Sequence, residues 1–321
     1  MKEIEANKQA WALLAKEHYQ HFKDAYANGN YTVNRYIAAE LGEIKGKKIL
    51  HLQCNTGADS IWLAQAGADV TGVDLVPENI FYARQLAADL NVANVKFIEA
   101  DIMTLRQSHH EQYDIVFTSE GAVIWLPDLN QWAQTINHLL RRDGCFYLFD
   151  AHPFYLMFDE TLFASGSLQV KYPYFNRSAE LEHSIGGYAA DARPADNYSW
   201  MYSIGGIVSA LAEAGLTICW LHEFDGYMES QGYMTQADDG LFYNEFTKDR
   251  IPMMFSLKAV SQKARTAKMI DDLLASQDEI ARHMEILRGQ GKTSTVKFKE
   301  LLAKKLTNNH MLILLEYYGL K

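Results

Sequence analysis

Residues 47–75, KKILHLQCNTGADSIWLAQAGADVTGVDL, are the segment that most constrains the fold of this chain. "KILHL" and "DVTGVDL" are apolar and β-branched runs typical of buried strands, and "DSIWLAQAG" between them repeats apolar residues at helical spacing. The alternation continues to residue 151, with helices expected over 77–91 and 129–144 and strands over 95–101, 113–119 and 145–151. Strands that alternate with helices of about 10 to 15 residues predict an α/β fold with a doubly wound, mostly parallel sheet.

The loop after the first strand, "HLQCNTG", indicates what such a sheet would bind. Ligands of open α/β sheets lie beyond the carboxyl ends of the strands, and a dinucleotide pyrophosphate there needs several close backbone amides, hence several glycines. This loop has only Gly57, with Gln53 and Asn55 where two glycines would stand. Asparagine tolerates a positive φ, so the turn survives, but a pyrophosphate seat is harder to build. A nucleoside carrying a charged amino acid, S-adenosyl-L-methionine, suits the loop better than NAD.

Acidic residues end the second and third strands. We expect Asp74 to accept hydrogen bonds from both ribose hydroxyls with its two oxygens, and Asp101 to accept one from the adenine amino group. The alternatives are a turn or capping role for Asp74 before "VPEN" and a plain turn role for Asp101. Asp59 and Ser60 are expected to cap the helix that follows the first loop.

These motifs resemble those of class I S-adenosylmethionine-dependent methyltransferases of the bacterial small-molecule type. The resemblance spans roughly residues 1–260 and is carried by "ILHLQCNTG", "VTGVDL", "FIEADI", "YDIVFTSEG" and the closing pair "GLTICWLHEF" and "PMMFSLKAV". It implies a Rossmann-like sheet with an antiparallel last strand, S-adenosyl-L-methionine as cofactor and methyl transfer as the reaction. The family usually has an acid where His51 stands, so this chain has a variant first motif.

The resemblance also implies a set of cofactor-binding residues, drawn from the strand ends and from N-terminal helices that often fold over the cofactor in this fold. The set is His51, Gln53, Asn55, Thr56, Gly57, Asp74, Leu75, Asp101, Ile102, Ser119 and Tyr19. Trp11 lies on the same N-terminal helices as Tyr19, and the alternative for both is a core aromatic role.

Methyl transfer from a sulfonium is an in-line displacement, so positioning supplies much of the rate, and a base is needed only for a protonated nucleophile. Glu120 in "TSEGAVIW" and His152 in "FDAHPF" are the candidate bases, with a structural role as the alternative for His152. Residues 168–202 and 226–251 are expected to form a lid. Its aromatic residues suggest a pocket for a compact, partly apolar molecule: Tyr172, Tyr174, Phe175, Tyr188, Tyr198, Trp200 and Tyr202.

The chain is expected to comprise a methyltransferase domain, residues 1–261, and a helical tail, residues 262–321. Within the domain we expect N-terminal helices (1–45), the cofactor-binding core (46–152), an insertion (153–202) and a closing helix and strand pair (203–261). The tail contains 11 Lys and Arg against 7 Asp and Glu, which leaves a net charge of −14 for the domain.

An acidic domain repels phosphate backbones, and "SEGAVIW" stands where base-modifying relatives have an Asn/Asp-Pro-Pro-aromatic run, so a nucleic-acid substrate is disfavoured. No apolar run is long enough for a bilayer, the three cysteines fit neither disulfides nor a metal site, and His18 and His21 lack partner ligands. We expect a cytoplasmic enzyme without metal, whose tail packs on the domain or pairs two copies. The remaining alternatives are a non-catalytic interaction protein and an NAD-dependent oxidoreductase.

Overall fold

The computed structural model describes residues 2–175, 178–187, 189–230 and 232–320. The chain divides into two compact units, Met1–Val260 and Ser261–Lys321, which we call the larger unit and the tail. In the described ranges, no helix is both long and apolar enough to cross a membrane.

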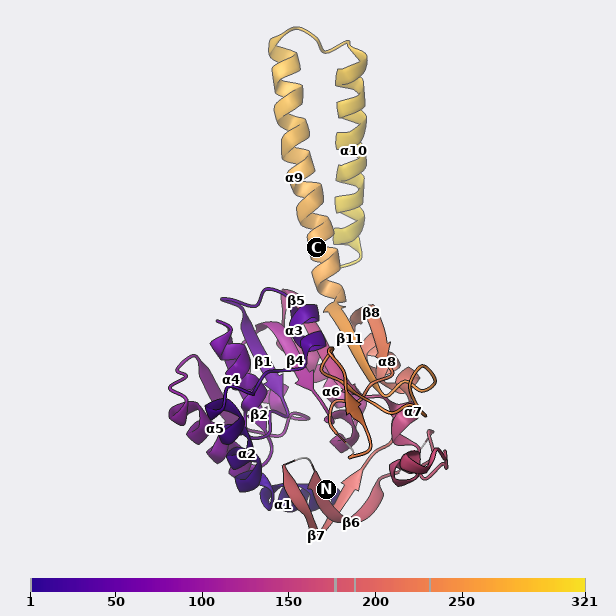
Figure 1. Ribbon diagram of the computed structural model, residues 1–321. Coiled ribbons are helices and arrows are strands. Elements are labelled where there is room, and N and C mark those ends of the chain that lie inside the picture. The colour runs from indigo at the N-terminus through magenta and orange to yellow at the C-terminus, as the bar shows by residue number, and fades with distance from the viewer. Residues whose placement is uncertain (1, 176–177, 188, 231, 321) are drawn as a thin grey trace. The chain divides into compact units, whose positions relative to one another are not determined.

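A seven-stranded sheet in the order β3-β2-β1-β4-β5-β11-β8 forms the centre of the larger unit (Figure 1). Its strands are β1 (Lys48–Leu52), β2 (Asp69–Asp74), β3 (Val95–Glu99), β4 (Tyr113–Ser119), β5 (Leu140–Ala151), β8 (Leu216–Phe224) and β11 (Met254–Ser261). The pairs β1–β2, β1–β4, β2–β3 and β4–β5 are parallel, whereas β11 runs antiparallel to β5. The predicted mostly parallel sheet with an antiparallel strand in the closing pair is therefore confirmed.

Helices cover both faces of this sheet. The helices of the larger unit are α1 (Lys2–Ala12), α2 (Ala15–Ala27), α3 (Arg35–Leu41), α4 (Ala58–Gln65), α5 (Pro77–Asp89), α6 (Leu129–Leu139), α7 (Pro153–Leu156) and α8 (Ile204–Glu213). Short 3₁₀ turns span Leu105–Gln107, Val123–Trp125 and Glu160–Ser165.

Alternation along the strands divides the core into two layers, because successive strand side chains point to opposite faces. Leu50 and Val116 belong to a buried cluster that includes α6 and α8, while Ile49 and Ile115 belong to a second cluster that includes α3 and α4. A doubly wound sheet places its ligand site at the carboxyl edge of the strands, between the loops that lead to these two helix layers.

The helix predicted over 129–144 is shorter than expected. Helix α6 ends at Leu139 and β5 already begins at Leu140, which pairs with Tyr113 of β4. Two tertiary contacts favour the extended backbone. Arg141 Nη1 lies 2.7 Å from Asp114 Oδ1, and a Cβ on Gly144 would stand 2.8 Å from the Tyr113 carbonyl oxygen.

The insertion forms an antiparallel hairpin of β6 (Glu180–Gly187) and β7 (Ala190–Ser199), and residues 226–251 contain a second small pair, β9 (Thr235–Gln236) and β10 (Phe242–Tyr243). Helix α1 packs on β7, and Asn7 joins them with two hydrogen bonds to the Tyr198 backbone, at 2.7 and 2.6 Å. The chain's N-terminal helix and the insertion thus form one layer.

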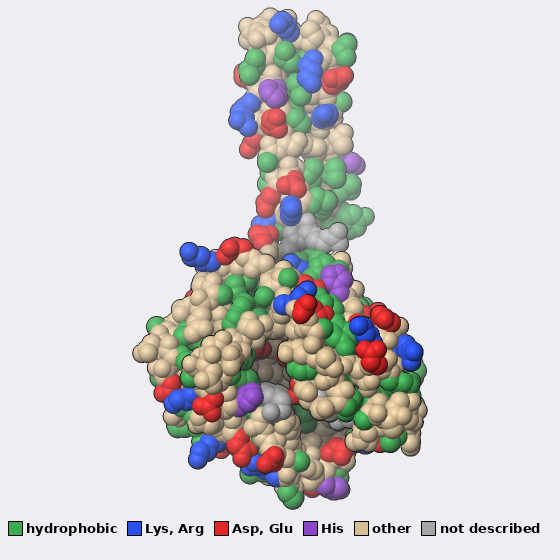
Figure 2. Space-filling view, viewed as in Figure 1, with side chains coloured by type: hydrophobic (Ala, Val, Ile, Leu, Met, Phe, Trp, Pro, Cys, Tyr) green, Lys and Arg blue, Asp and Glu red, His purple; other side chains and the backbone are tan. Residues whose placement is uncertain are grey.

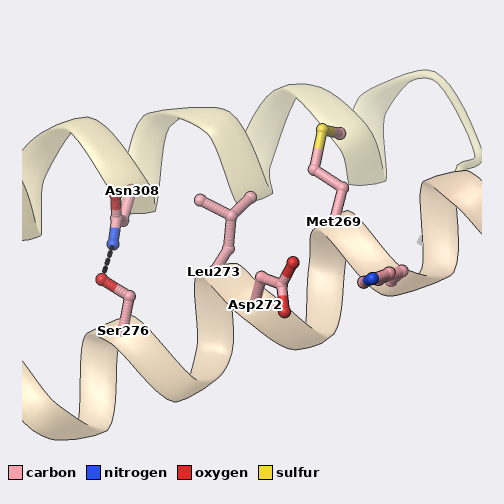
Figure 3. Close-up of a pocket in the computed structure, with 6 residues that line it drawn as sticks. Met269, Asp272, Leu273, Ser276 and Asn308 are labelled. Atoms are coloured by element: carbon pink, nitrogen blue, oxygen red, sulfur yellow. Dashed lines mark hydrogen bonds between the residues drawn. The ribbon is translucent and has the colours of Figure 1, made fainter.

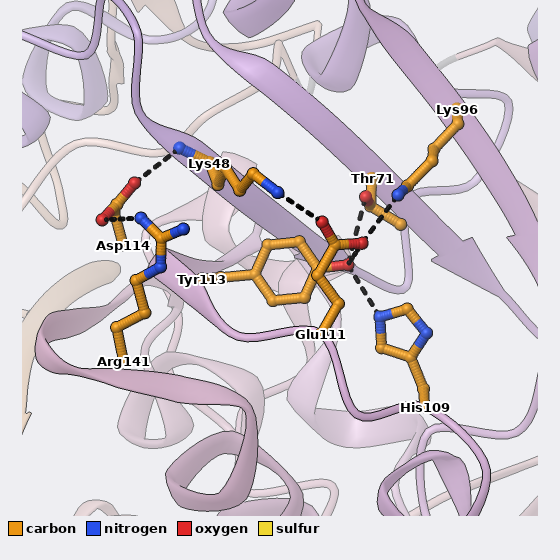
Figure 4. A network of polar contacts seen from close by, with 8 residues as sticks. All are labelled: Lys48, Thr71, Lys96, His109, Glu111, Tyr113, Asp114 and Arg141. Carbon is orange, nitrogen blue, oxygen red and sulfur yellow. Dashed lines mark hydrogen bonds and ion pairs between the residues drawn. The ribbon is translucent and has the colours of Figure 1, made fainter.

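A polar network closes the amino edge of the sheet, opposite the ligand edge (Figure 4). The Glu111 carboxylate accepts hydrogen bonds from Lys48 of β1 and Lys96 of β3, both at 2.7 Å. The Tyr113 hydroxyl lies 3.2 Å from Thr71 Oγ1 of β2 and 2.7 Å from His109. These contacts tie neighbouring strands together at the edge that carries no ligand site.

The tail is an antiparallel pair of helices, α9 (Gln262–Gly289) and α10 (Val296–Tyr317). Apolar residues join the helices near both ends of the pair, in one cluster with Ile280, Met284, Phe298 and Leu301 and another with Ile270, Leu312 and Leu315. Between these clusters the contacts are polar, including a hydrogen bond of 3.0 Å from Asn308 to Ser276 (Figure 3).

Candidate active site

A cavity of about 650 Å³ lies at the carboxyl edge of β1, β2 and β4. Its floor comes from the strand ends, and its other walls come from α1, α2, the β6–β7 hairpin and the segment 228–230. The space-filling view shows the larger unit hollowed between the sheet and this hairpin (Figure 2). A cavity of this volume is in the range of small-molecule sites, about 300–1,000 Å³.

The first loop bends without the usual glycines. Gln53 and Asn55 adopt φ values of 55° and 50°, and Gly57 has a φ of 80°. Their side chains do not fill the cavity, because the Gln53 amide donates to Ala122 O at 2.9 Å and the Asn55 amide oxygen accepts from Thr56 N at 2.6 Å. The predicted positive φ at Asn55 is present, and Gln53 shares it at a cost of about 1–2 kcal/mol for a non-glycine residue.

Asp74 lies at the end of β2, on the cavity wall. Its Oδ2 accepts from Asn55 N at 2.9 Å, and its Oδ1 accepts from Val76 N and Asn79 Nδ2 at 2.9 and 3.2 Å. Each carboxylate oxygen accepts about two hydrogen bonds, so Oδ2 alone keeps free acceptor capacity. The expectation that both oxygens bind ribose hydroxyls is therefore revised to one direct bond from Oδ2.

Asp101, Leu75 and Ile102 also line the cavity, as the sequence motifs predict for an adenine site. The Asp101 Oδ1 accepts a hydrogen bond from Met103 N at 2.9 Å, which fixes the carboxylate at the end of the third strand.

His51 connects the floor of the cavity to its side wall. Its Nδ1 lies 2.8 Å from Ser60 Oγ and its Nε2 lies 3.0 Å from Ser119 Oγ. Burial lowers the pKa of His51 to about 4, against a smaller opposing effect of the Asp59 charge. The ring is therefore neutral near pH 7.

Asp59 decides the direction of these hydrogen bonds. Ser119 Oγ lies 2.6 Å from Asp59 Oδ2, and a carboxylate only accepts, so the serine hydroxyl donates to it. Ser119 then accepts from His51 Nε2–H, and His51 Nδ1 accepts from the Ser60 hydroxyl. The second oxygen of Asp59 accepts from the Tyr31 hydroxyl.

The expectation that Asp59 and Ser60 cap α4 is wrong. The N-cap position is Gly57, no side chain caps the helix, and both residues bond instead to partners outside it.

Glu120 follows β4 and its side chain faces the cavity, where solvent reaches it although protein surrounds it on all sides. This burial raises the pKa of Glu120 well above its usual range, and the negative charges of Asp59, Asp150 and Glu229 raise it further. Asp150 holds the loop in place, since its carboxylate accepts from the backbone amides of Gly121, Ala122 and Val123 at 2.6 to 3.1 Å.

Four predicted site residues do not line the cavity. Tyr19 donates to Asp89 at 2.5 Å and stacks on Tyr82, so it joins α2 to α5. Thr56 is buried, and Gly57 packs so closely on Phe97 that a Cβ there would stand 2.6 Å from the ring.

His152 is the fourth, and its predicted role as a base is not supported by its position. It is 3% exposed, its Nδ1 accepts from Phe154 N as the cap of α7, and its Nε2 lies 2.9 Å from Glu223. The structural alternative therefore describes this residue better.

The lid aromatics Tyr172, Tyr174, Phe175, Tyr198, Trp200 and Tyr202 also lie outside the cavity lining, and Tyr188 is not among the described residues. The hairpin instead contributes small residues, Ser184 to Gly187, and Asn197.

Sequence reasoning missed part of the opposite wall. Trp11, His18 and Trp125 line the cavity, and Trp11 packs edge-on against both other rings, at 5.8 and 5.2 Å. His18 shares a hydrogen bond with the Asn55 side chain. The amphipathic pattern of residues 2–27 predicts helices, but it does not say which face meets the first loop.

Known proteins resemble this chain in the same region. The family model of the methyltransferase domain matches residues 49–144. The chain belongs to the class I S-adenosylmethionine-dependent methyltransferases. A protein named as a methyltransferase in Geobacillus sp. is 29% identical over 150 residues, which are 46% of this chain and 60% of that protein. A ubiquinone biosynthesis O-methyltransferase of Haemophilus ducreyi is 32% identical over 117 residues, 35% of this chain and 49% of that protein.

Among solved structures, an S-adenosylmethionine-dependent methyltransferase from Clostridium acetobutylicum matches with a TM-score of 0.51 at 13% identity. The match covers 75% of this chain and 97% of that chain, and it shows a shared fold. The chain spans about half of the lengths of the curated relatives it matches, so its own activity and substrate are argued below from the cavity.

The cavity's donor set fits the family's cofactor. Five carboxylates line it (Asp59, Asp74, Asp101, Glu120 and Glu229), whereas Lys8 is the sole Lys or Arg among the described lining residues. A cation with hydroxyl groups, such as S-adenosyl-L-methionine, suits an acceptor-rich wall, while the pyrophosphate of NAD would meet like charge.

Proposed function

We propose that this protein transfers a methyl group from S-adenosyl-L-methionine to a small molecule bound in the same cavity. The observation that supports this most directly is the acid-rich, cation-poor lining. The family assignment of residues 49–144 points the same way. The two other functions that the sequence allowed, a non-catalytic interaction protein and an NAD-dependent oxidoreductase, have no supporting observation of this kind.

When bound, the cofactor supplies an electrophilic methyl group on a sulfonium, which is a cation with a good leaving group. The chain's part is to hold nucleophile and methyl donor in line and to exclude water. Asp74 Oδ2 and Asp101 would hold the nucleoside, with Leu75 and Ile102 beside the base. Gln53 and Asn55 shape the loop beneath the amino acid part.

Glu120 is the group we propose as base, since it faces the cavity and lacks a side-chain hydrogen bond among the described residues. Its raised pKa makes it a better proton acceptor near neutral pH than an ordinary glutamate. An alcohol, phenol or ammonium nucleophile would lose its proton to this carboxylate as the methyl group arrives.

We propose a compact substrate, because the cavity must hold it beside the cofactor within about 650 Å³. Trp11 and Trp125 give that space an apolar side. The similarity to ubiquinone biosynthesis O-methyltransferases covers about a third of this chain, so we take from it the reaction class and no particular substrate. The three free cysteines suit a reducing cytoplasm, where we place the reaction.

Calorimetric titration tests the proposal. We expect S-adenosyl-L-methionine and S-adenosylhomocysteine to bind and NAD to give no heat of binding. A screen of small alcohols, phenols and amines for release of S-adenosylhomocysteine would then identify the acceptor. Binding of NAD without binding of S-adenosylhomocysteine would refute the proposal in favour of the oxidoreductase.

We also propose that the tail pairs two copies of this chain. A two-helix hairpin buries one face of each helix, yet α10 has a second apolar stripe that is exposed: Leu302, Leu306, Ile313 and Tyr317 are 41%, 60%, 63% and 81% exposed. A four-helix bundle formed by two hairpins would bury this stripe. Its test is given at the scale of the whole molecule below.

A further inference from the structure

Asp59 is a carboxylate for which the fold itself offers no cation. In the described part of the chain it forms no ion pair, and Lys8, the one basic side chain on the cavity wall, lies 3.9 Å from Glu99 instead. Its hydrogen-bond partners are two neutral hydroxyls, Tyr31 and Ser119. Neutral donors hold the carboxylate in place and leave its charge uncompensated.

The donors come from three different parts of the fold and converge on this one side chain. Tyr31 lies between α2 and α3, and Ser119 ends β4 and is itself fixed by His51 of β1. All four residues line the cavity. Each Asp59 oxygen accepts one of these hydrogen bonds, so each keeps capacity for a second donor on the cavity side.

A simpler explanation is that Asp59 stabilises α4 as an acid in its first turn, which contributes about 0.3–1 kcal/mol. That role needs neither the two hydroxyl donors nor a place on the cavity wall. It also predicts no effect on any ligand, and the two explanations therefore differ in a measurable way.

We infer that Asp59 is the anionic group that binds the α-ammonium of S-adenosyl-L-methionine, because β1 presents the neutral His51 where relatives present an acid. An ammonium has three N–H donors and a full positive charge, which match the free acceptor capacity and uncompensated charge of Asp59. His51 acts through Ser119 and is a positioning residue in this arrangement.

The inference rests on the proposed function, and the experiment separates the two. Binding of S-adenosylhomocysteine and of 5′-methylthioadenosine is measured by calorimetry for the wild type and for Asp59→Asn. The second ligand has the same nucleoside and thioether but no amino acid, so it does not report on the ammonium.

We expect Asp59→Asn to weaken S-adenosylhomocysteine by roughly 10- to 100-fold, as for the loss of a hydrogen bond to a charged group. The affinity for 5′-methylthioadenosine should stay within about twofold, the scatter of such a titration. Asp89→Asn is the matched control, since Asp89 pairs with Lys23 and Tyr19 away from the cavity, and it should change neither affinity.

Equal weakening of both ligands, or no weakening of either, would overturn the role of Asp59 while leaving the proposed function intact. A wild type that binds neither ligand would overturn both. If Asp59→Asn does not fold, Tyr31→Phe removes one donor to the same carboxylate and should weaken only S-adenosylhomocysteine, by a smaller factor. An equal effect of Tyr31→Phe on both ligands would also count against the inference.

Discussion

His51 links the chemistry of the cavity floor to the stability of the fold. Burial holds its pKa at about 4 in the folded chain, compared with 6.5 for an ordinary histidine. Between these pH values the unfolded state binds more protons, so the free energy of unfolding falls as the pH is lowered from 6.5 to 4. The difference corresponds to about 3 kcal/mol for this one residue.

We expect His51→Asn to lose that part of the pH dependence, measured as denaturant unfolding at pH 8, 6 and 4.5. Some dependence will remain, because burial lowers the pKa of His18 to about 4 as well. His183→Asn serves as the control, since this side chain is 77% exposed. An unchanged slope in His51→Asn would show that the ring is protonated in the folded state.

Glu120 is predicted to titrate far from an ordinary glutamate. Burial and the neighbouring carboxylates raise its pKa, so it should take up a proton at a pH where exposed glutamates remain ionised. A carbon NMR titration with labelled glutamate should show one such carboxyl, and Glu120→Gln should remove it. With an acceptor in hand, Glu120→Gln should lower kcat by roughly 100-fold or more if Glu120 is the base.

The opposite result would be a set of carboxyl signals that all titrate in the usual range. It would remove the reason to choose Glu120 as the base.

At the scale of elements, the wall that faces the sheet consists of α1 and the β6–β7 hairpin. Asn7 bonds both the N–H and the carbonyl of Tyr198 and is 6% exposed, so it acts like an added strand residue at the edge of β7. Because this wall covers the cavity, its opening would control entry of ligands.

We expect Asn7→Ala to loosen the hairpin while the sheet stays intact, because two buried backbone groups lose their partners. Hydrogen exchange of residues 189–199 should become about tenfold faster or more, and S-adenosylhomocysteine should slow it again. Gln9→Ala is the matched control, since Gln9 bonds only Glu5 on the same exposed helix surface. Equal exchange in both variants would mean that Asn7 does not hold the wall.

At the scale of the whole molecule, the two units predict different behaviour in solution. The larger unit contains the complete cavity, whereas the tail exposes the apolar stripe of α10. We expect light scattering to give a dimer for the full chain and a monomer for residues 1–261. The shortened chain should still bind S-adenosylhomocysteine.

A triple variant, Leu306→Ser, Ile313→Ser and Tyr317→Ser, should give the same monomer without any deletion. Val170→Ser, which alters an apolar residue of the larger unit that is 56% exposed, should remain dimeric. A monomeric wild type, or a dimer that survives the triple variant, would contradict pairing through α10.

The sequence predicted well wherever the signal was local. Strand and helix periods over residues 48–119 gave the elements nearly at their observed bounds, and the strand ends then placed Asp74, Asp101 and Glu120 at one edge. Predictions failed where a distant partner decides the outcome. His152 is paired by Glu223 of β8, and residues 140–144 are drawn into β5 by the β4 strand.

By itself, then, the order of apolar and polar residues determined a doubly wound sheet and the edge at which its ligand site lies, because periodicity and parallel strand direction are properties of neighbouring residues. Only the tertiary structure decided which side chains face that edge. Tyr31, Ser119 and His51 converge on Asp59 across 88 residues of chain, and such convergence depends on packing between segments that no local pattern encodes.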